Sequence, residues 1–476
     1  MLFNTPEYAI FFSIVLLIYF VLPFRKQNVW LLAASYFFYG SWDWRFLSLL
    51  LLSTVIDFSA GLLIQAARER DDRRGMKRAL VLSVGGQLLI LGIFKYFNFF
   101  AGSVAALLEA IGFRASLPTL QVLLPIGISF YTFQTMSYTI DIYRGAFMPT
   151  RSFVDFALSV AFFPHLVAGP IQRARSLIVQ IERPRVVTHE HWARGLTLLL
   201  TGLIRKVAIA DPAGVLVDSY FAHPASFTSI PLLCGLLLYG LQIYNDFAGY
   251  SEMARGSANL MGFDLMRNFR HPYFARNISD FWTRWHISLS TWLRDYLYIS
   301  LGGNRKGHSR TYFNLMITML LGGLWHGASW NFVIWGALHG TYLCVYHAWH
   351  QRSGDLAVPA PETGVAAVLR PVVSTACVYA LVTFTWLFFR SHDIATTMAY
   401  LSGMFAFKGG FEGALIPVAA LWALTLAIDL PQALADDECT VITWTPVRRA
   451  AFVTAGLMAV LFSGNIGHEA FIYFQF

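Results

Sequence analysis

Long runs of apolar residues recur along the chain and constrain its fold more than any other feature. A helix that crosses the ~30 Å hydrocarbon core of a bilayer needs about 20 predominantly apolar residues. Such runs occur near residues 8–23, 45–65, 79–100, 121–140, 153–169, 192–210, 230–249, 312–348, 370–389, 412–430 and 449–466. The run at 312–348 is long enough for two elements. The sequence therefore predicts an all-α, multi-pass membrane protein with roughly ten to twelve tilted or re-entrant helices.

The composition excludes most classes of soluble protein. Of the 476 residues, 56% are apolar and only 13% are charged, which is too little charge to cover a surface that faces water. The net charge of +8 does not indicate nucleic acid, because the basic residues lie in short loops between apolar runs. Membrane topology and anionic lipid explain such loops better. We see no soluble domain, and we expect one integral-membrane domain over residues 1–476.

Basic loops predict how the chain is oriented in the membrane. The densest of them are Arg25–Lys26, Arg68–Arg78 and Asn304–Arg310, and basic loops remain in the cytoplasm. No basic residue precedes the first apolar run, so we expect a retained span with the N-terminus outside. A break at Gly40–Asp43 would let the chain return to the cytoplasmic side, and residues 353–369 read as a surface loop.

Neither the cysteines nor the spaced histidines predict a metal site. None of the cysteines belongs to a C-x-x-C pair, and we expect buried thiols without a disulfide framework at Cys234, Cys344, Cys377 and Cys439. The spacing of His347 and His350 would suit a metal, but no carboxylate or cysteine completes a ligand set.

Residues 264–310 combine basic and aromatic residues. From Ser279 to Ser300 the pattern predicts one amphipathic helix at the membrane interface or re-entering it, with an apolar stripe at Trp285, Leu289, Trp292 and Tyr296. Asp280 and Arg284 are four residues apart and can form an ion pair.

Two interpretations of the basic residues in this segment remain open. Arg284, Arg294, Arg305 and Lys306 either grip anionic lipid headgroups or form a cationic funnel for a phosphate-bearing donor such as coenzyme A.

His326 stands among glycines in the stretch Gly322-Gly-Leu-Trp-His-Gly-Ala-Ser-Trp330. A helix that begins near Tyr312 would place it ~21 Å along the axis, near the middle of the bilayer. Ionisable residues are costly there and usually mark a functional cavity. A neutral imidazole can accept a hydroxyl proton near neutral pH. The alternative is a structural histidine that bonds to a neighbouring helix.

Other polar residues in apolar runs are less informative. Asn245 and Asp246 either line the same cavity or pair with an arginine. His165 precedes a Gly-Pro break and is expected to be structural, whereas His339, like His347 and His350, is expected to lie towards an interface.

Several stretches together closely resemble the membrane-bound O-acyltransferase family, and within it the alginate O-acetylase type of bacterial polysaccharide acetyltransferase. The resemblance covers nearly the whole chain, down to its ending at Phe471–Phe476. The stretches that carry it are Leu124-Pro-Ile-Gly-Ile-Ser-Phe-Tyr-Thr-Phe-Gln134, Phe163-Pro-His-Leu-Val-Ala-Gly-Pro170, Asp280-Phe-Trp-Thr-Arg-Trp-His286 with its continuation to Tyr298, Gly302-Gly-Asn-Arg-Lys306 and Gly323-Leu-Trp-His326-Gly-Ala-Ser-Trp330.

This resemblance implies a ring of helices around a central tunnel across the membrane, with residues 264–350 as the catalytic core segment. His326 falls on the family's near-invariant catalytic histidine, and His286 on its second signature position. We expect Arg284, Arg294, Arg305 and Lys306 to bind the donor. The residues expected to line the tunnel are Trp285, Trp325, Asn245 and Asp246.

The resemblance also implies the reaction: an acetyl group moves from cytoplasmic acetyl-CoA to a hydroxyl of an exopolysaccharide or cell-wall glycan. Acetyl-CoA would be a co-substrate, with no bound cofactor or metal, in the bacterial inner membrane. Transfer would be direct or through a periplasmic SGNH-type acetyltransferase partner, and the acceptor polymer stays open. The Gly302–Lys306 stretch favours acetyl over D-alanyl transfer. Departures from the family pattern at Asn245, Glu252–Arg255 and His271 bear on the acceptor more than on the reaction.

Two functions of other classes compete with an acyltransferase. A transporter of acyl groups or lipid-linked sugars would explain embedded charges, but the chain shows no halves related by repetition. A scaffold subunit of a polysaccharide-export complex would show no turnover.

Overall fold

The structure is a computed structural model of the chain, and it describes residues 1–113, 118–120, 123–167, 169–353, 365–410, 413–463 and 471–472. All regular structure in this part of the chain is helical, which confirms the predicted all-α class. Contacts divide it into two compact units. The first comprises Met1–Leu199 with Met253–Met266, and the second comprises Leu200–Glu252 with Arg267–Phe476.

Six helical stretches among the described residues are long and apolar enough to cross a membrane, and the shorter apolar helix Pro6–Val21 accompanies them. The six are Phe24–Glu69, Arg73–Ala110, Ser229–Leu260, Leu369–Arg390, Leu415–Ala435 and Pro446–Ser463. The chain is therefore a membrane protein of several spans, as predicted. The central tunnel remains a prediction.

The first unit is a set of helices, of which the first has a capped N-terminus. Thr5 accepts a hydrogen bond from the backbone N–H of Tyr8 at 3.4 Å, and Pro6 occupies the first helical turn, so α1 begins there. The helices are α1 (Pro6–Val21), α2 (Phe24–Asp43), α3 (Leu47–Glu69), α4 (Arg73–Leu91), α5 (Phe97–Ala110), α6 (Ile128–Arg144), α7 (Phe153–Ala161), α8 (Phe163–Leu166), α9 (Ala174–Ile181) and most of α10 (His189–Leu203).

Two predictions for this unit can be compared with its helices. The break predicted at Gly40–Asp43 is confirmed, because α2 ends at Asp43 and a short 3-10 turn separates it from α3. The apolar run at 153–169 forms the two short helices α7 and α8, which Phe162 separates.

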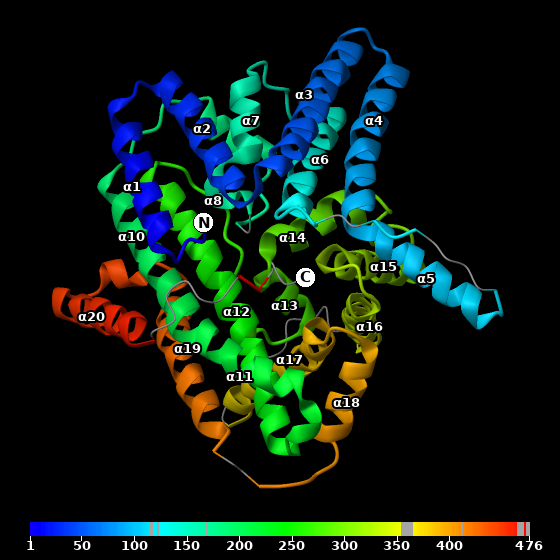
Figure 1. The fold of residues 1–476 in the computed structure, drawn as a ribbon, viewed down its shortest axis with the longest axis vertical. Helices are drawn as coiled ribbons and strands as arrows, with labels where there is room; N and C mark the ends of the chain where they lie inside the picture. Colours follow the sequence, from blue (N-terminus) through cyan, green and yellow to red (C-terminus); the bar gives the residue numbers. More distant parts are fainter. Residues whose placement is uncertain are drawn as a thin grey trace. The chain divides into compact units, whose positions relative to one another are not determined.

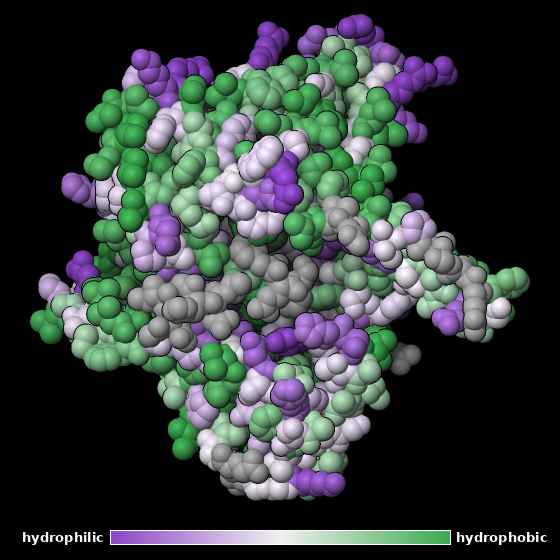
Figure 2. Space-filling model, in the orientation of Figure 1, coloured by the Kyte–Doolittle hydropathy of each residue, from purple (hydrophilic) through white to green (hydrophobic). Residues whose placement is uncertain are grey.

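The hairpin of α3 and α4 has the surface of a membrane-facing element (Figure 1). Its tip consists of six exposed charged residues, Glu69 to Arg74. Figure 2 shows hydrophilic side chains gathered at this tip and hydrophobic side chains along the flanks. Apolar flanks can face lipid, whereas the charged tip requires water or headgroups.

The second unit contains the segments on which the functional predictions rest. Within it α15 and α16 pack closely side by side, α13 packs on α16, and α16 on α17. The helices are α11 (Asp211–Ala222), α12 (Ser229–Leu260, whose last residues belong to the first unit), α13 (Ile278–Arg284), α14 (Ile287–Trp292), α15 (His308–His326), α16 (Trp330–Ser353), α17 (Val365–Arg390), α18 (Ile394–Met404), α19 (Leu415–Ala435) and α20 (Pro446–Ser463).

The run at 312–348 forms two elements, α15 and α16, as predicted. However, α15 begins at His308 rather than near Tyr312. His326 is the last residue of this helix. The loop predicted at 353–369 falls largely outside the described residues.

The prediction of buried cysteines holds for Cys234 and Cys439 but is wrong for the other two. Cys344 is half-buried and Cys377 is exposed. Cys377 lies on the candidate span Leu369–Arg390 of α17. An apolar residue of a spanning helix can face lipid as readily as the protein core, so an apolar run does not predict burial.

Candidate active site

His286 occupies a sharp turn that interrupts the predicted helix of 279–300. Asn277 caps α13 by accepting a hydrogen bond from the N–H of Asp280 at 2.7 Å. The helix stops at Arg284, Trp285 is extended, and His286 has a left-handed φ of 42° before α14 begins at Ile287. The prediction of one continuous helix is therefore wrong. A non-glycine residue in this conformation costs about 1–3 kcal/mol and persists only where its surroundings hold it.

Asn268 is the residue that holds this turn. Its backbone oxygen accepts the N–H of Ile287 at 2.8 Å, and its side-chain oxygen accepts the hydroxyl of Ser288 at 2.6 Å. Its amide nitrogen donates to the hydroxyl of Ser251 on α12 at 3.0 Å. Two residues further on, the N–H of Arg270 donates to the carbonyl of Arg284 at 3.0 Å. Hydrogen bonds thus fasten the chain on both sides of His286.

The two signature histidines lie together in the second unit. The ring centroids of His286 and His326 are 6.2 Å apart, and both side chains are buried. Trp325 contacts both imidazoles, with centroid distances of 5.7 Å to His286 and 5.1 Å to His326. The structure therefore brings together residues that are 40 positions apart in the sequence, as their expected shared role requires.

Burial determines the protonation state of His286. The side chain is fully buried and lies outside the six candidate spans. Desolvation lowers the pKa of its imidazole to about 3, because the charged form loses its hydration. A neutral imidazole at neutral pH can accept a proton or orient a neighbouring group.

The glycines around His326 let α15 and α16 approach each other. A Cβ atom on Gly323 would lie 2.1 Å from the carbonyl oxygen of Phe332, and one on Gly327 would lie 2.0 Å from the Phe332 ring. On α16, a Cβ atom on Gly336 would lie 2.4 Å from the carbonyl oxygen of Met319. Gly323 and Gly327 therefore serve close packing of the two helices.

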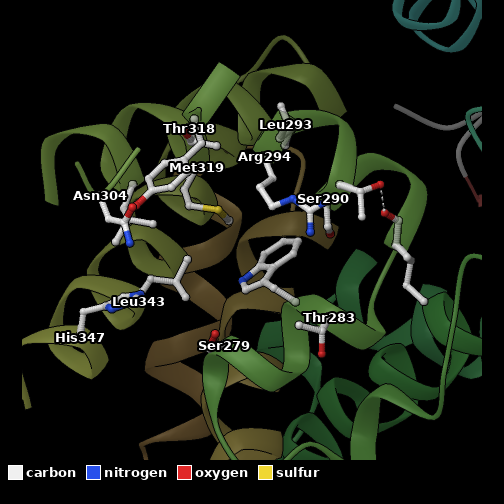
Figure 3. Close-up of a pocket in the computed structure, with 15 residues that line it drawn as sticks. Ser279, Thr283, Ser290, Leu293, Arg294, Asn304, Thr318, Met319, Leu343 and His347 are labelled. Carbon is white, nitrogen blue, oxygen red and sulfur yellow. Dashed lines mark hydrogen bonds between the residues drawn. The ribbon is translucent and has the colours of Figure 1, made fainter. Parts of the chain in front are cut away.

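A cavity of about 500 Å³ lies between the 279–304 segment and the pair α15–α16, and neither His286 nor His326 is among its lining residues (Figure 3). Among its lining residues, Ile287 follows His286 directly and Met319 precedes His326 by two helical turns. Arg294 points into the cavity from the 279–304 segment, as Figure 3 shows. The remaining lining residues are Ser279, Trp282, Thr283, Ser290, Thr291, Leu293, Tyr298, Asn304, Leu315, Thr318, Leu343 and His347.

The four candidate donor-binding residues are not equivalent. Arg294 lines the cavity and pairs with Asp295 at 2.8 Å. Arg284 does not line it and forms the predicted ion pair with Asp280 at 2.6 Å. Arg305 and Lys306 are exposed and directly follow Asn304, which does line the cavity. Arg294 thus points into the cavity, whereas Arg305 and Lys306 follow a lining residue in the sequence.

Trp285 and Trp325 have different surroundings. Trp285 is packed in an aromatic cluster, with ring centroids 5.0 Å from Phe269 and 4.9 Å from Trp386. Trp325 instead contacts His286 and His326. Among the described residues, Trp325 is therefore the tryptophan that touches both histidines.

Asn245 lies in a buried ion cluster around Arg205. The guanidinium donates to Glu252 at 3.0 Å, to Asn245 at 3.1 Å and to Asp429 at 2.5 Å. His271 approaches Asp429 at 3.7 Å. Three residues that depart from the family pattern thus belong to this cluster. Asn245 and Glu252 bond to Arg205 directly, and His271 lies next to Asp429.

Asp246 belongs to a neighbouring buried pair. Its carboxylate lies 2.8 Å from the ammonium of Lys206, which also approaches Asp211 at 2.8 Å, and it accepts the N–H of Ile472 at 2.7 Å. Sequence reasoning overlooked both Arg205 and Lys206. Two adjacent cations inside the apolar run 192–210 were the available signal, because buried charges need partners.

Two other buried histidines have structural surroundings. His165 bonds to Gln134 at 2.9 Å, as expected of a structural residue. The expectation that His339 lies towards an interface is wrong, because it is fully buried and bonds to Thr385 at 2.9 Å. Within the described ranges no three His, Cys, Asp or Glu side chains are grouped as metal ligands.

Comparison with known proteins gives a consistent set of relatives. The family model of the membrane-bound O-acyltransferases matches residues 144–355. A probable alginate O-acetylase of Azotobacter vinelandii is 45% identical over 398 residues, which are 84% of this chain and 76% of that protein.

Two further relatives extend this comparison. A probable alginate O-acetylase of Pseudomonas putida is 39% identical over 497 aligned positions, which cover 98% of each chain. A peptidoglycan O-acetyltransferase of Helicobacter pylori is 33% identical over 441 positions, which cover 86% of this chain and 80% of that protein.

Proposed function

Because the chain belongs to the membrane-bound O-acyltransferase family, we propose that it transfers an acetyl group from acetyl-CoA to a hydroxyl of an exported polysaccharide. As a member of this family it is an O-acyltransferase. The names of its relatives support the acetyl group and the polymer, since they describe O-acetylation of alginate and of peptidoglycan. One observation carries the proposal: two buried imidazoles lie 6.2 Å apart, and Ile287, directly after His286, lines a cavity into which Arg294 points.

The donor would occupy this cavity. Arg294, with Arg305 and Lys306 beyond Asn304, offers positive charge for the phosphates of coenzyme A, while apolar lining residues such as Leu293, Leu315 and Leu343 suit the pantetheine arm. The thioester would then lie towards the end of α15. Lipid headgroups remain the alternative ligand for Arg284, which lies outside the cavity lining and is already paired with Asp280.

The chemical step requires one base and no metal ion. His326 would remove the proton of the acceptor hydroxyl, whose oxygen attacks the thioester carbonyl carbon. The C–S bond breaks, the ester forms, and the thiolate of coenzyme A takes up a proton. His286, neutral and held in its turn by Asn268, would orient or assist His326. Direct transfer between bound donor and acceptor is our default, with a covalent acyl-histidine as the alternative.

Location and partners follow from the same proposal. Acetyl-CoA is a cytoplasmic metabolite, so the loop Asn304–Arg310 would face the cytoplasm of a bacterial inner membrane, and the acceptor would approach from the other side. The hydroxyl would belong either to the polymer itself or to a periplasmic SGNH-type partner that relays the acetyl group. D-alanyl transfer is the nearest alternative reaction, and the Gly302–Lys306 stretch argues for acetyl.

Purified chain in proteoliposomes can test this function against its rivals. Radiolabelled acetyl-CoA would be supplied with deacetylated alginate oligosaccharides, with and without a periplasmic SGNH-type acetyltransferase. The enzyme predicts labelled acetyl esters on the sugar or on the partner. A transporter would instead carry label across the bilayer without forming an ester, and a scaffold would form no ester with any partner. Either result would overturn the proposed function.

A further inference from the structure

A second, smaller cavity of about 170 Å³ lies in the same unit, where α11 and α17 end and α18 begins. Five of its seven lining residues are polar or charged. The lining residues are Asp218, Phe221, Ala222, Arg390, Ser391, His392 and Thr396.

An ion pair dominates the electrostatics of this cavity. The guanidinium of Arg390 donates to the carboxylate of Asp218 at 2.6 Å and lies over the ring of Phe221 at 5.5 Å. The Arg390 side chain is 12% exposed, while that of Asp218 is 50% exposed. A guanidinium has five N–H donors and a carboxylate about four acceptor sites. The guanidinium can therefore donate further hydrogen bonds to a ligand, and the carboxylate can accept further hydrogen bonds from it.

The cavity is connected to His326 through the end of α17. Phe389, the neighbour of Arg390, has its ring centroid 5.0 Å from that of His326. Asn331, at the start of α16, donates to the carbonyl of Ser391 at 2.8 Å. This bond ties the connection between α17 and α18 to the helix that follows His326.

This cavity and the candidate donor cations lie towards different ends of α15. Arg305 and Lys306 precede the first residue of that helix, and His326 is the last. Eighteen residue steps at 1.5 Å each separate the two ends by ~27 Å. A molecule bound near Arg390 would therefore approach His326 from the side opposite to Arg305 and Lys306.

We propose that the cavity binds one sugar unit of the acceptor polymer and presents a neighbouring hydroxyl to His326. This inference rests on the proposed function. A carboxylate beside a guanidinium matches a pair of adjacent sugar hydroxyls, since one hydroxyl can donate while the other accepts. Ser391 and Thr396 add neutral hydroxyl groups, and the small volume admits a single ring rather than a protein segment. Only binding occurs in this cavity, and no bond is made or broken there.

The test compares the apparent KM values for two substrates. Deacetylated alginate oligosaccharides serve as the acceptor probe, and the variants are Asp218→Asn, Arg390→Gln and Arg390→Lys. We expect the first two to raise the acceptor KM at least about tenfold, the loss typical of a hydrogen bond to a charged group. The KM for acetyl-CoA should stay unchanged, and Arg390→Lys should restore part of the acceptor affinity. Asp43→Asn, which breaks an ion pair of the same 2.6 Å length in the first unit, is the matched control.

The outcomes distinguish this inference from the proposed function. An unchanged acceptor KM in Asp218→Asn and Arg390→Gln, together with wild-type acetyl transfer, overturns the sugar site and leaves the enzyme intact. Absence of transfer by the wild type both to oligosaccharide and to a periplasmic SGNH-type partner overturns the proposed function itself. If the variants impair only acetylation of a protein partner, while transfer to free oligosaccharide stays normal, the cavity binds a partner protein and the sugar assignment is wrong.

Discussion

Replacing Asn268 with alanine should impair catalysis by releasing the turn that carries His286. The change removes three side-chain hydrogen bonds: two with Ser288, from its hydroxyl at 2.6 Å and its backbone N–H at 3.4 Å, and one to Ser251 at 3.0 Å. Each of the two shorter bonds is worth about 1 kcal/mol net and the long one adds little, so the turn loses about 2 kcal/mol of restraint. That loss is comparable with the ~1–3 kcal/mol cost of the left-handed conformation of His286. The competent geometry should then be populated roughly 30-fold less.

Initial rates with radiolabelled acetyl-CoA should report this loss in kcat, at roughly 10- to 30-fold, with a small change in the donor KM. Asn28→Ala is a matched control, because Asn28 is equally buried and its amide donates to Asp155 at 2.7 Å and to the carbonyl of Ile181 at 3.0 Å. It should lose similar thermal stability but keep its kcat. Asn268→Asp, which keeps a hydrogen-bond acceptor for Ser288, should recover part of the activity. Equal kcat values for Asn268→Ala and Asn28→Ala would refute the positioning role.

Three further outcomes follow from the site. Arg294→Gln should raise the KM for acetyl-CoA about tenfold with little change in kcat, and this effect should weaken with salt. The control Arg276→Gln, at an exposed residue, should leave the KM unchanged. If the acetyl-CoA titrations of Arg294→Gln and the wild type overlap, Arg294 is a lipid anchor only. A cysteine at Ser309, in a background without native cysteines, should react with a membrane-impermeant reagent only after the membrane is opened; labelling in intact spheroplasts would place that loop outside. Burial lowers the pKa of His286 to about 3, below the ~6.5 of an exposed histidine. Between these two values the unfolded chain binds a proton that the folded chain does not. The free energy of unfolding therefore falls as pH drops from about 6.5 towards 3. His286→Asn should reduce that fall in melting temperature, and an unchanged pH profile would contradict this reasoning.

Local and solvent-driven features could be predicted from the sequence. The apolar runs predicted a multi-pass helical protein because a spanning segment must satisfy its own backbone hydrogen bonds. The pair Asp280–Arg284 could be predicted because residues four apart adjoin on a helix. Motif resemblance selected His286 and His326, which the structure brings within 6.2 Å of each other.

The features that sequence reasoning missed depend on distant contacts. The spacing of Trp285, Leu289 and Trp292 continues across the turn at His286, so periodicity alone could not reveal the break. That break depends on Asn268, about twenty positions away. Likewise, Arg205 meets Asp429 across 224 positions, and no local pattern links them.

The most direct test of the account is the acetyl content of polymer from cells that carry His326→Ala. We predict that acetylation falls by at least about 100-fold, the lower range for loss of a general base, while the protein stays in the membrane at its normal level. His339→Gln, which alters an equally buried histidine outside the proposed chemistry, should retain acetylation. Near-normal acetyl content in the His326→Ala strain would contradict the assignment of His326 as the catalytic base.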